Sequence, residues 1–396
     1  MSLGNLNFYD VSVDDLKDLI NAEVPEGLNI EYKRDFYGSS DDDKKEALKD
    51  ISSFANSFGG HLIIGMTARD GIPTELSGLQ NAIPDKAIQY LENLVRDGIE
   101  PRITGIRMKA IPVDSEHFAL VLRIPRSWNP PHRVRAKNVN RFYIRNSAGA
   151  HEVSVEELRS LFTLSATLHD RIIAFRRERL AILSADEGPI KIEAQGRLIL
   201  HVIPLSAFSY TSALDVKQIF NHHSFFRPIS SMGYNHQFNF DGVLIVRDGD
   251  KCYGYTQIFR NGIIEATKAS LVREHEGMKV IPSLSFDNYI FEVLPGYLNG
   301  LRALDIPPPL VVMISLQEVY GAFLGVTNSI YDFDSRIKFN KSELLLPEIM
   351  IDDYGSEQDY QKSMKPAFDA LWNAAGYAAS KYFNEKDIWV GEQNNA

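Results

Sequence analysis

Two spacings of apolar residues recur along the first part of the chain, and each predicts one kind of secondary structure. Residues 12–22 and 41–58 place apolar side chains three and four positions apart, which is typical of amphipathic helices. Residues 28–36 alternate apolar and polar side chains, which predicts a strand with one polar face. Similar patterns predict a helix at 84–99 and strands at 61–66, 102–113, 117–125 and 141–146.

The first domain is expected to end after one more helix. A capping box, with Ser154 three positions before Glu157, starts a helix that ends near residue 163, so we place the first domain at residues 1–163. Residues 163–185 have the pattern of a long helix, and with the turn-like residues after it they form a connecting segment at 164–188. Four arginines of this linker helix are expected to lie in water: Arg171, Arg176, Arg177 and Arg179.

The second half of the chain has the pattern of an antiparallel sheet covered by helices. A strand at 196–205 precedes three turn dipeptides, and helices are expected near 288–304 and 366–383. Residues 189–396 are therefore an α+β domain of unknown function with a loose polar tail, and the whole chain is of the mixed α/β (α+β) class. The turn dipeptides that predict a β-meander are Asp241-Gly242, Asp248-Gly249 and Asn261-Gly262.

The composition excludes several classes of protein. With 44% hydrophobic and 24% charged residues among 396, the chain is globular and long enough for two or three domains. No apolar run approaches the roughly 18 residues of a membrane-spanning helix, and no secretory signal is expected. Cys252 is the single cysteine, which rules out an intramolecular disulfide and argues against a thiolate zinc site. We therefore expect a cytoplasmic protein without a membrane partner.

Charge is distributed unevenly along the chain. The net charge of −10 argues against broad attraction to nucleic acid, but residues 123–146, the basic segment, contain no acidic residue. Guanidinium groups bind phosphate oxygens in pairs, and the interleaved rings of Trp128, Phe142 and Tyr143 could stack on unpaired bases. The alternative is an arginine-rich surface loop that is solvated or pairs with the acidic body. The cations of the segment are Arg123, Arg126, Arg133, Arg135, Lys137, Arg141 and Arg145, with His132 beside them.

A second candidate site lies in residues 25–36, where two carboxylates stand close to a Lys-Arg pair. Glu26 and Glu31 are five positions apart, and Lys33 and Arg34 follow directly. Hard divalent cations prefer clustered carboxylate oxygens, and metal-dependent nucleases use short arrays of this kind. Salt-bridged edge strands have the same composition. The residues alone therefore leave both interpretations open.

Six short motifs occur in order along the first domain. They are the Glu-x-Lys strand, Phe54-Ala55-Asn56, Gly59-Gly60, the Ile64-Gly65 strand end, Pro131-His132 and Tyr143-Ile144-Arg145. In this order and spacing they resemble the Schlafen-AlbA domain over roughly residues 12–163. The resemblance implies a nucleic-acid-binding module of the prokaryotic type, often described as DNA-binding. In vertebrate Schlafens, a related core is an endoribonuclease that cuts structured RNA with three acidic residues and a divalent metal.

The resemblance also assigns roles to residues of the second candidate site. Glu26, Glu31 and Lys33 match the catalytic pattern, and the two glutamates would bind Mg²⁺ or Mn²⁺, the only cofactors implied. A regular strand places residues five apart on opposite faces, although the intervening glycine could break the pleat and let both converge. Ala68 occupies the position of the third acid. Asp70, in an Arg-Asp-Gly turn, is the nearest carboxylate and completes the candidate catalytic set.

Three functions remain open at this stage. The first is a nucleic-acid-binding protein, for DNA or structured RNA. The second is a metal-dependent endoribonuclease for tRNA-type substrates in defence or as a toxin. The third is a protein-interaction scaffold, which predicts basic side chains that are scattered or paired with acids. A homodimer could supply a second nucleic-acid-binding lobe. The candidate binding residues are Lys33, Arg34, Arg123, Arg126, His132, Arg133, Arg135, Lys137, Arg141, Tyr143 and Arg145.

Overall fold

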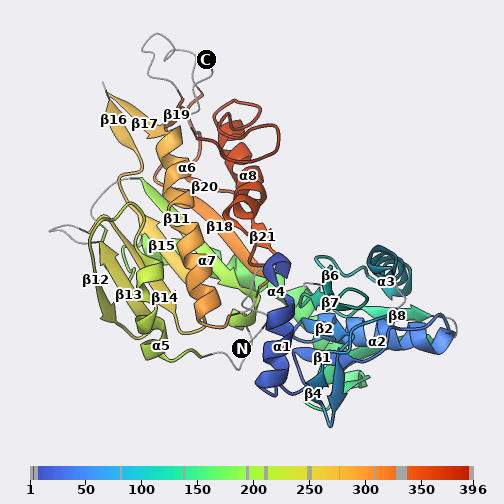
Figure 1. The fold of residues 1–396 in the computed structure, drawn as a ribbon. Helices are drawn as coiled ribbons and strands as arrows, with labels where there is room; N and C mark the ends of the chain where they lie inside the picture. The colour runs from blue at the N-terminus through green and yellow to red at the C-terminus, as the bar shows by residue number, and fades with distance from the viewer. Residues whose placement is uncertain are drawn as a thin grey trace. The chain divides into compact units, whose positions relative to one another are not determined.

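The chain folds into two compact units, Met1–Arg171 (unit 1) and Ile172–Ala396 (unit 2), which are described separately. Both units combine helices with sheets, which confirms the predicted mixed α/β (α+β) class (Figure 1). The computed structural model describes residues 3, 8–80, 83–127, 129–136, 139–192, 196–208, 213–247, 252–275, 277–306, 308–326 and 337–391.

Unit 1 is built on a four-stranded sheet with helices on both faces. Its strand order is β1 (Ile30–Lys33), β2 (Gly60–Ile64), β7 (Phe118–Ile124) and β6 (Arg107–Pro112). Strand β1 runs parallel to β2, and the other pairs are antiparallel. One face packs against α2 (Asp41–Asn56) and α3 (Pro84–Gly98), and the other against α1 (Val13–Asn21). The helices and strands expected in this region are therefore present.

The basic segment forms most of a second sheet in unit 1. This sheet has the order β10 (Gly149–Glu152), β9 (Val139–Asn146), β8 (Arg133–Ala136) and β5 (Ile99–Glu100). A small hairpin of β3 (Thr67–Arg69) and β4 (Ile72–Glu75) and a 3₁₀ turn at Phe8–Asp10 complete the unit. Strands β8 and β9 lie against α2, so the chain brings the basic segment next to the helix that follows the Glu-x-Lys strand.

Unit 2 contains an eight-stranded sheet whose first part is the predicted meander. Every pair of neighbouring strands in it is antiparallel. The order is β12 (Tyr234–Phe238), β13 (Gly242–Arg247), β14 (Gly254–Phe259), β15 (Ile264–Lys268), β11 (Arg197–Pro204), β18 (Leu310–Gln317) and β20 (Glu343–Leu345), with β21 (Ile349–Ile351) also pairing with β18.

Three helices cover one face of this sheet, as Figure 1 shows for α6 and α7. They are α6 (Ser283–Phe291), α7 (Leu294–Ala303) and α8 (Glu357–Ala374). The remaining elements are the short helix α5 (Val216–Asn221), 3₁₀ turns at Leu205–Phe208 and His223–Phe226, and a small sheet of β16 (Arg273–His275), β17 (Met278–Pro282) and β19 (Phe323–Gly325).

Helix α4 (Val155–Ser184) is one continuous helix where two were expected. Its C-terminal part packs on the other face of the unit 2 sheet through Leu180 and Leu183. The expectation that its arginines lie in water is wrong for Arg176 and Arg179. Arg176 is 2% exposed, and Arg179 donates two 2.8 Å hydrogen bonds to the buried carboxylate of Glu265. Neither α4 nor any other described helix is long and apolar enough to cross a membrane.

The described part of the C-terminal tail is docked, which differs from the loose segment expected. The Trp389 ring packs 5.1 Å from the Phe291 ring, and its Nε1 donates to the buried Asp287 carboxylate at 3.2 Å. Aromatic burial of this kind outweighs the polar composition of the neighbouring residues. Residues 392–396, the last part of that expectation, lie outside the described residues.

Candidate nucleic-acid interface

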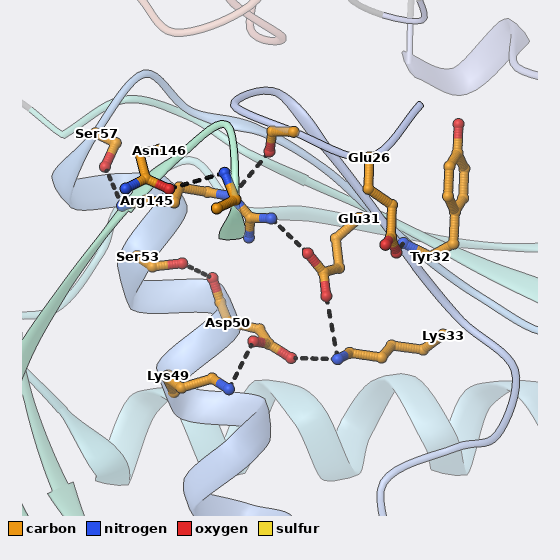
Figure 2. A network of polar contacts seen from close by, with 12 residues as sticks. Glu26, Glu31, Tyr32, Lys33, Lys49, Asp50, Ser53, Ser57, Arg145 and Asn146 are labelled. Carbon is orange, nitrogen blue, oxygen red and sulfur yellow. Dashed lines mark hydrogen bonds and ion pairs between the residues drawn. The ribbon is translucent and has the colours of Figure 1, made fainter. Parts of the chain in front are cut away.

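Strand β1 directs the Glu-x-Lys pair toward α2. Tyr32 packs in the core beneath α1, so its neighbours Glu31 and Lys33 point to the opposite face of the strand. Helix α2 lies on that face and presents Asp50 to them. Figure 2 shows the resulting chain of contacts, which runs from Lys49 through Asp50, Lys33 and Glu31. The sheet and one helix therefore assemble this site.

Lys33 is surrounded by three carboxylates, which we call the acidic cluster: Glu31, Glu46 and Asp50. Its Nζ lies 3.1 Å from an oxygen of Glu31, 3.1 Å from Glu46 and 3.3 Å from Asp50. Burial opposes the charge of Lys33, but the negative charges of Asp50 and Glu31 outweigh it and raise the pKa of the ammonium. Lys33 therefore stays protonated and supplies the positive charge that these carboxylates need to lie together.

Asp50 belongs to this site but was not among the residues predicted from the sequence. Its side chain is 2% exposed and accepts a 2.8 Å hydrogen bond from the Tyr37 hydroxyl. Burial raises the pKa of Asp50, and the charges of Lys33 and Lys49 partly offset this. A signal was present, because Asp50 lies on the apolar face of α2, where an acidic residue requires a partner.

The second oxygen of Glu31 is also occupied, since it accepts a hydrogen bond from the Arg145 guanidinium. Burial alone would favour the neutral acid, but this bond and the charges of Arg145 and Lys33 lower the pKa of Glu31 below its ordinary value. Glu31 is therefore ionised, and each of its oxygens contacts a cation of the protein.

Glu26 lies next to the turn that contains Asp70, but its hydrogen bonds are to backbone groups. Its backbone N donates to the Gly71 carbonyl at 2.7 Å, and its carboxylate accepts a 2.9 Å hydrogen bond from the backbone of Tyr32. Burial is the main cause that raises the pKa of Glu26, and the Glu31 charge adds to it. Asp70 is exposed in the β3–β4 turn with φ of 51°, and Ala68 lies within β3.

These residues do not fit a divalent-metal centre in the arrangement observed. Both oxygens of Glu31 are bound by Lys33 and Arg145, and the Lys33 ammonium lies where a cation shared by the acidic cluster would lie. Across the part of the chain that the structure describes, no three His, Cys, Asp or Glu side chains are grouped so that they could hold a metal ion. We therefore derive no metal-dependent step from this site.

Two arginines of the basic segment point into unit 1. The Arg145 guanidinium stacks 4.0 Å from the centroid of the Phe54 ring and donates to the Gly27 carbonyl at 3.1 Å. Arg123 is 8% exposed and donates a 2.8 Å hydrogen bond to His61 Nε2. Burial and the Arg123 charge lower the pKa of His61 to about 3, so His61 accepts as a neutral ring. In this conformation, neither arginine is available to a phosphate.

His132 and Tyr143 are also buried, and Asn56 joins them. Asn56 Nδ2 donates to the carbonyls of His132 and Tyr143 at 3.0 and 2.9 Å, and its Oδ1 accepts from the His132 backbone at 2.6 Å. The amide thus satisfies three backbone groups that are cut off from water, which matches the capping role that its residue type suggests. His132 and Tyr143 therefore hold the second sheet against α2.

Three arginines of the basic segment face solvent, and we call them the outer arginines: Arg133, Arg135 and Arg141. Arg133 and Arg135 share one carboxylate, Glu100, at 2.8 and 3.1 Å. Arg141 pairs with Glu152 at 2.7 Å. All of these side chains are exposed by 39% or more, so water and salt screen each pair.

The remaining candidate cations are Arg34, Arg126 and Lys137. Arg34 is exposed just after β1. The Arg126 guanidinium lies 5.7 Å from the centroid of the Phe58 ring, which is itself 48% exposed. Lys137, and the neighbouring aromatic Trp128, lie outside the described residues.

Comparison with known proteins supports the assignment of the first unit. Residues 26–154 match the family model described as Schlafen, AlbA_2, and no curated protein matches the chain. Among similar solved structures is the N-terminal domain of an ATP-dependent DNA helicase RecG-related protein from Nitrosomonas europaea, which is 23% identical, covers 37% of this chain and 94% of that chain, and has a TM-score of 0.27. The DIP2311 protein from Corynebacterium diphtheriae is 14% identical, and the match covers 38% of this chain and 28% of that chain with a TM-score of 0.26. Residues 26–154 of this chain therefore form a domain of the Schlafen, AlbA_2 family, as the ordered motifs predicted.

Proposed function

We propose that unit 1 binds nucleic acid, DNA or structured RNA, and that the outer arginines contact its phosphates. The family of residues 26–154 suggests nucleic-acid binding in general. The observation that carries the finer proposal is that Arg133 and Arg135 share the carboxylate of Glu100. Among the described residues no second carboxylate pairs with either arginine, so one positive charge stays uncompensated at an exposed position.

The outer arginines can exchange their carboxylate partners for phosphate groups at little cost in free energy. An exposed ion pair between Arg and Glu is screened by water and salt, so its loss costs little free energy. A phosphate accepts charge-assisted hydrogen bonds from the same guanidinium groups, often two at once. Contact with a polyanion also releases its condensed counterions, which adds a favourable term at low salt. The outer arginines can therefore leave their carboxylates, whereas Arg123 and Arg145 are held by buried contacts.

Salt-dependent binding of the Arg133→Gln/Arg135→Gln double variant tests this proposal. Fluorescence anisotropy with labelled tRNA, single-stranded DNA and duplex DNA gives the affinity over a series of salt concentrations. We expect the double variant to bind more weakly at low salt, with a salt slope reduced by about 2, because each phosphate contact contributes about 1.

The matched control is Lys279→Gln/Lys362→Gln, which removes the same charge from two exposed positions of unit 2. It is expected to leave the salt slope unchanged. A slope equal to that of the wild type in Arg133→Gln/Arg135→Gln would reject these arginines as phosphate contacts. Failure of the wild-type protein to bind any of the three nucleic acids at low salt would reject the proposal as a whole.

A protein-interaction scaffold is the second candidate, and one observation favours it. The outer arginines are paired with Glu100 and Glu152, and Arg123 and Arg145 are buried, which is the arrangement that a scaffold predicts. The same titration separates the two functions. A scaffold binds none of the nucleic acids at low salt, whereas the proposed function requires salt-sensitive binding.

An endoribonuclease would require Glu31 to leave both Lys33 and Arg145 before it could contact a metal. We therefore expect tRNA incubated with the protein and Mn²⁺ to be bound and to remain intact. The Glu31→Gln variant serves as the comparison. Cleavage by the wild-type protein that depends on Mn²⁺ and disappears in Glu31→Gln would replace the binding function with the enzymatic one.

We also propose that two copies of the chain act together on one nucleic acid. One family domain is matched per chain, and a symmetric dimer is the common way to supply a second binding surface. Light scattering of the free protein and of its tRNA complex measures the number of chains in each. A single chain in both samples would reject the dimer without affecting the phosphate contacts.

A further inference from the structure

Two cations of unit 2 flank a glycine at one end of the eight-stranded sheet. Lys268, the last residue of β15, lies opposite Gly254 of β14. Arg247, the last residue of β13, follows the Val246–Tyr255 pair and so lies opposite Gly254 on the other side. Residues directly opposite each other in antiparallel strands point to the same face. Arg247 and Lys268 therefore share one face, with no side chain between them.

This face is the one that α6 covers (Figure 1), and α6 contributes a ring to the same position. The Lys268 ammonium lies 4.5 Å from the centroid of the Tyr289 ring. Arg273 of β16 donates to the hydroxyl of the same tyrosine at 3.5 Å. The backbones of β13 and β15 are about 10 Å apart, since β14 lies between them, so long side chains from both can reach one small group.

In the described part of the chain, these three cations have no acidic ion-pair partner, although one of them, Lys268, is nearly buried. Lys268 is 5% exposed, and its described hydrogen bond goes to the Ala269 carbonyl at 3.2 Å. Among the described residues, no carboxylate forms an ion pair with Arg247, Lys268 or Arg273. Glu292 is the carboxylate that acts on Lys268, and it lies 3.7 Å from Arg227. A nearly buried ammonium without a counter-charge is costly, so the position favours an anion.

The electrostatics of Lys268 agree with this geometry. Burial is the main cause that lowers the pKa of Lys268 to about 8, and the positive charges of Arg247 and Arg273 lower it further. Lys268 therefore experiences repulsion from two neighbouring cations, and an anion bound there would offset it.

We propose that Arg247, Lys268 and Arg273 form an anion-binding site in unit 2 that takes a phosphate group. A phosphate carries several acceptor oxygens and can receive hydrogen bonds from three separate cationic side chains at once, which a carboxylate with two oxygens does less well. Inorganic phosphate, a nucleoside monophosphate and a nucleic-acid backbone share this chemistry, and each can supply the group. The site does not depend on the function proposed for unit 1.

Thermal unfolding of the full chain with increasing inorganic phosphate, against sodium chloride at equal ionic strength, tests the site. We expect a saturable rise in Tm that chloride does not produce, of about 5 °C at a hundredfold excess over Kd. Arg273→Gln, at an exposed position, and Arg247→Gln are expected to weaken phosphate binding at least fivefold, and Lys268→Met to abolish the saturable rise. Lys362→Gln, an exposed position on α8, is the matched control and should behave like the wild type.

Two arms of the experiment identify the source of the phosphate and guard against misfolding. Adenosine monophosphate and a short single-stranded oligonucleotide are compared with inorganic phosphate. The probe that saturates the rise in Tm at the lowest concentration identifies the form of phosphate that the site prefers. Circular dichroism establishes that Arg247→Gln and Arg273→Gln are folded. Equal effects of phosphate and chloride on the wild type, or full phosphate binding in both folded arginine variants, would overturn the proposal.

Discussion

Lys33 compensates three carboxylates with a single charge, and the most buried of them depends on it most. Asp50 is 2% exposed, so it cannot turn to water when Lys33 is removed. We predict that Lys33→Met lowers the free energy of unfolding of unit 1 by about 3 kcal/mol, because a buried charge that loses its partner costs on that order. Hydrogen exchange of unit 1 amides during a urea titration measures the loss.

The same variant should be less destabilised in acid. Burial raises the pKa of Asp50 in the folded protein, and Lys33 opposes this, so removal of Lys33 raises that pKa further. A carboxyl with a raised folded pKa is favoured by protonation, so the loss in Lys33→Met is expected to shrink from about pH 7 to about pH 4. Lys49→Met, 3.7 Å from the other oxygen of Asp50, is the control and should lose under about 1 kcal/mol. Equal losses in both variants would contradict the role assigned to Lys33.

Residue spacing predicted only part of this site. Alternation along β1 correctly placed Glu31 and Lys33 on one face, because that depends on the local pleat. The contacts of Arg145 with Glu31 and of Asp50 with Lys33 depend on how α2 and β9 pack against β1. Those contacts join residues far apart in the chain, so composition showed cations and acids without showing which would pair.

At the scale of elements, the register between β5 and β8 determines which carboxylate Arg133 and Arg135 contact. Glu100 of β5 lies directly opposite Arg133 of β8, which holds its carboxylate against both Arg133 and Arg135. We predict that Glu100→Gln strengthens nucleic-acid binding at low salt by about threefold, because it removes a competing anion next to two phosphate contacts. Fluorescence anisotropy with the same labelled tRNA measures the change.

The control for this prediction removes an equal charge from the other unit. Glu178→Gln changes an exposed residue in the unit 2 part of α4. It should alter affinity far less than Glu100→Gln does. If both variants gained affinity equally, net charge alone would account for the gain, and the shared carboxylate would have no specific effect.

Helix α4 illustrates why a boundary between elements is hard to predict. Residues 155–184 contain neither glycine nor proline, so nothing in the backbone stops the helix. A boundary was nevertheless expected near residue 163, where Ser160, Thr163 and Thr167 lie close together. Their hydroxyls donate to carbonyls four residues earlier, as hydroxyls within a helix do.

The docking of α4 on the unit 2 sheet depends on a buried ion pair. Glu265 is fully buried and accepts from Arg179, His201 and the Tyr255 hydroxyl. We predict that Arg179→Met lowers the free energy of unfolding of unit 2 by about 3–5 kcal/mol, since Glu265 would keep a charge without its main partner. Arg177→Met, at an exposed position of the same helix, should change it by less than about 0.5 kcal/mol. Urea unfolding followed by tryptophan fluorescence measures both variants.

The pKa of Glu265 determines the pH range over which the ion pair stops contributing to the free energy of unfolding. Burial favours the neutral acid, but the Arg179 and His201 contacts outweigh it and lower the pKa of Glu265 to about 2. A lowered folded pKa gives stability that is complete above the ordinary value of 4.5 and is lost as the pH falls toward about 2. The difference between wild type and Arg179→Met should therefore narrow over that interval. A difference that stayed constant across it would argue against ionised Glu265.

For the molecule as a whole, the order of elements was predictable and the arrangement of unit 2 was only partly so. The turn dipeptides Asp241-Gly242 and Asn261-Gly262 predicted the meander, because each lies at the connection between two strands that pair with each other, β12 with β13 and β14 with β15. The third dipeptide, Asp248-Gly249, lies outside the described residues. Strand β11 pairs with β18 across more than a hundred residues, and the docking of Trp389 joins similarly distant segments. No local signal encodes such pairs, since they depend on which apolar faces remain to be covered.

The two units have separate cores, and they should therefore unfold separately. The apolar clusters around α2 and α1 belong to unit 1, and those around α6 and Leu180 belong to unit 2. We predict two transitions in calorimetry of the full chain, because units with cores of their own behave as separate cooperative systems. Lys33→Met should lower the Tm of one transition and Arg179→Met that of the other. A single transition that both variants shift by the same amount would mean that the units stabilise each other and unfold as one.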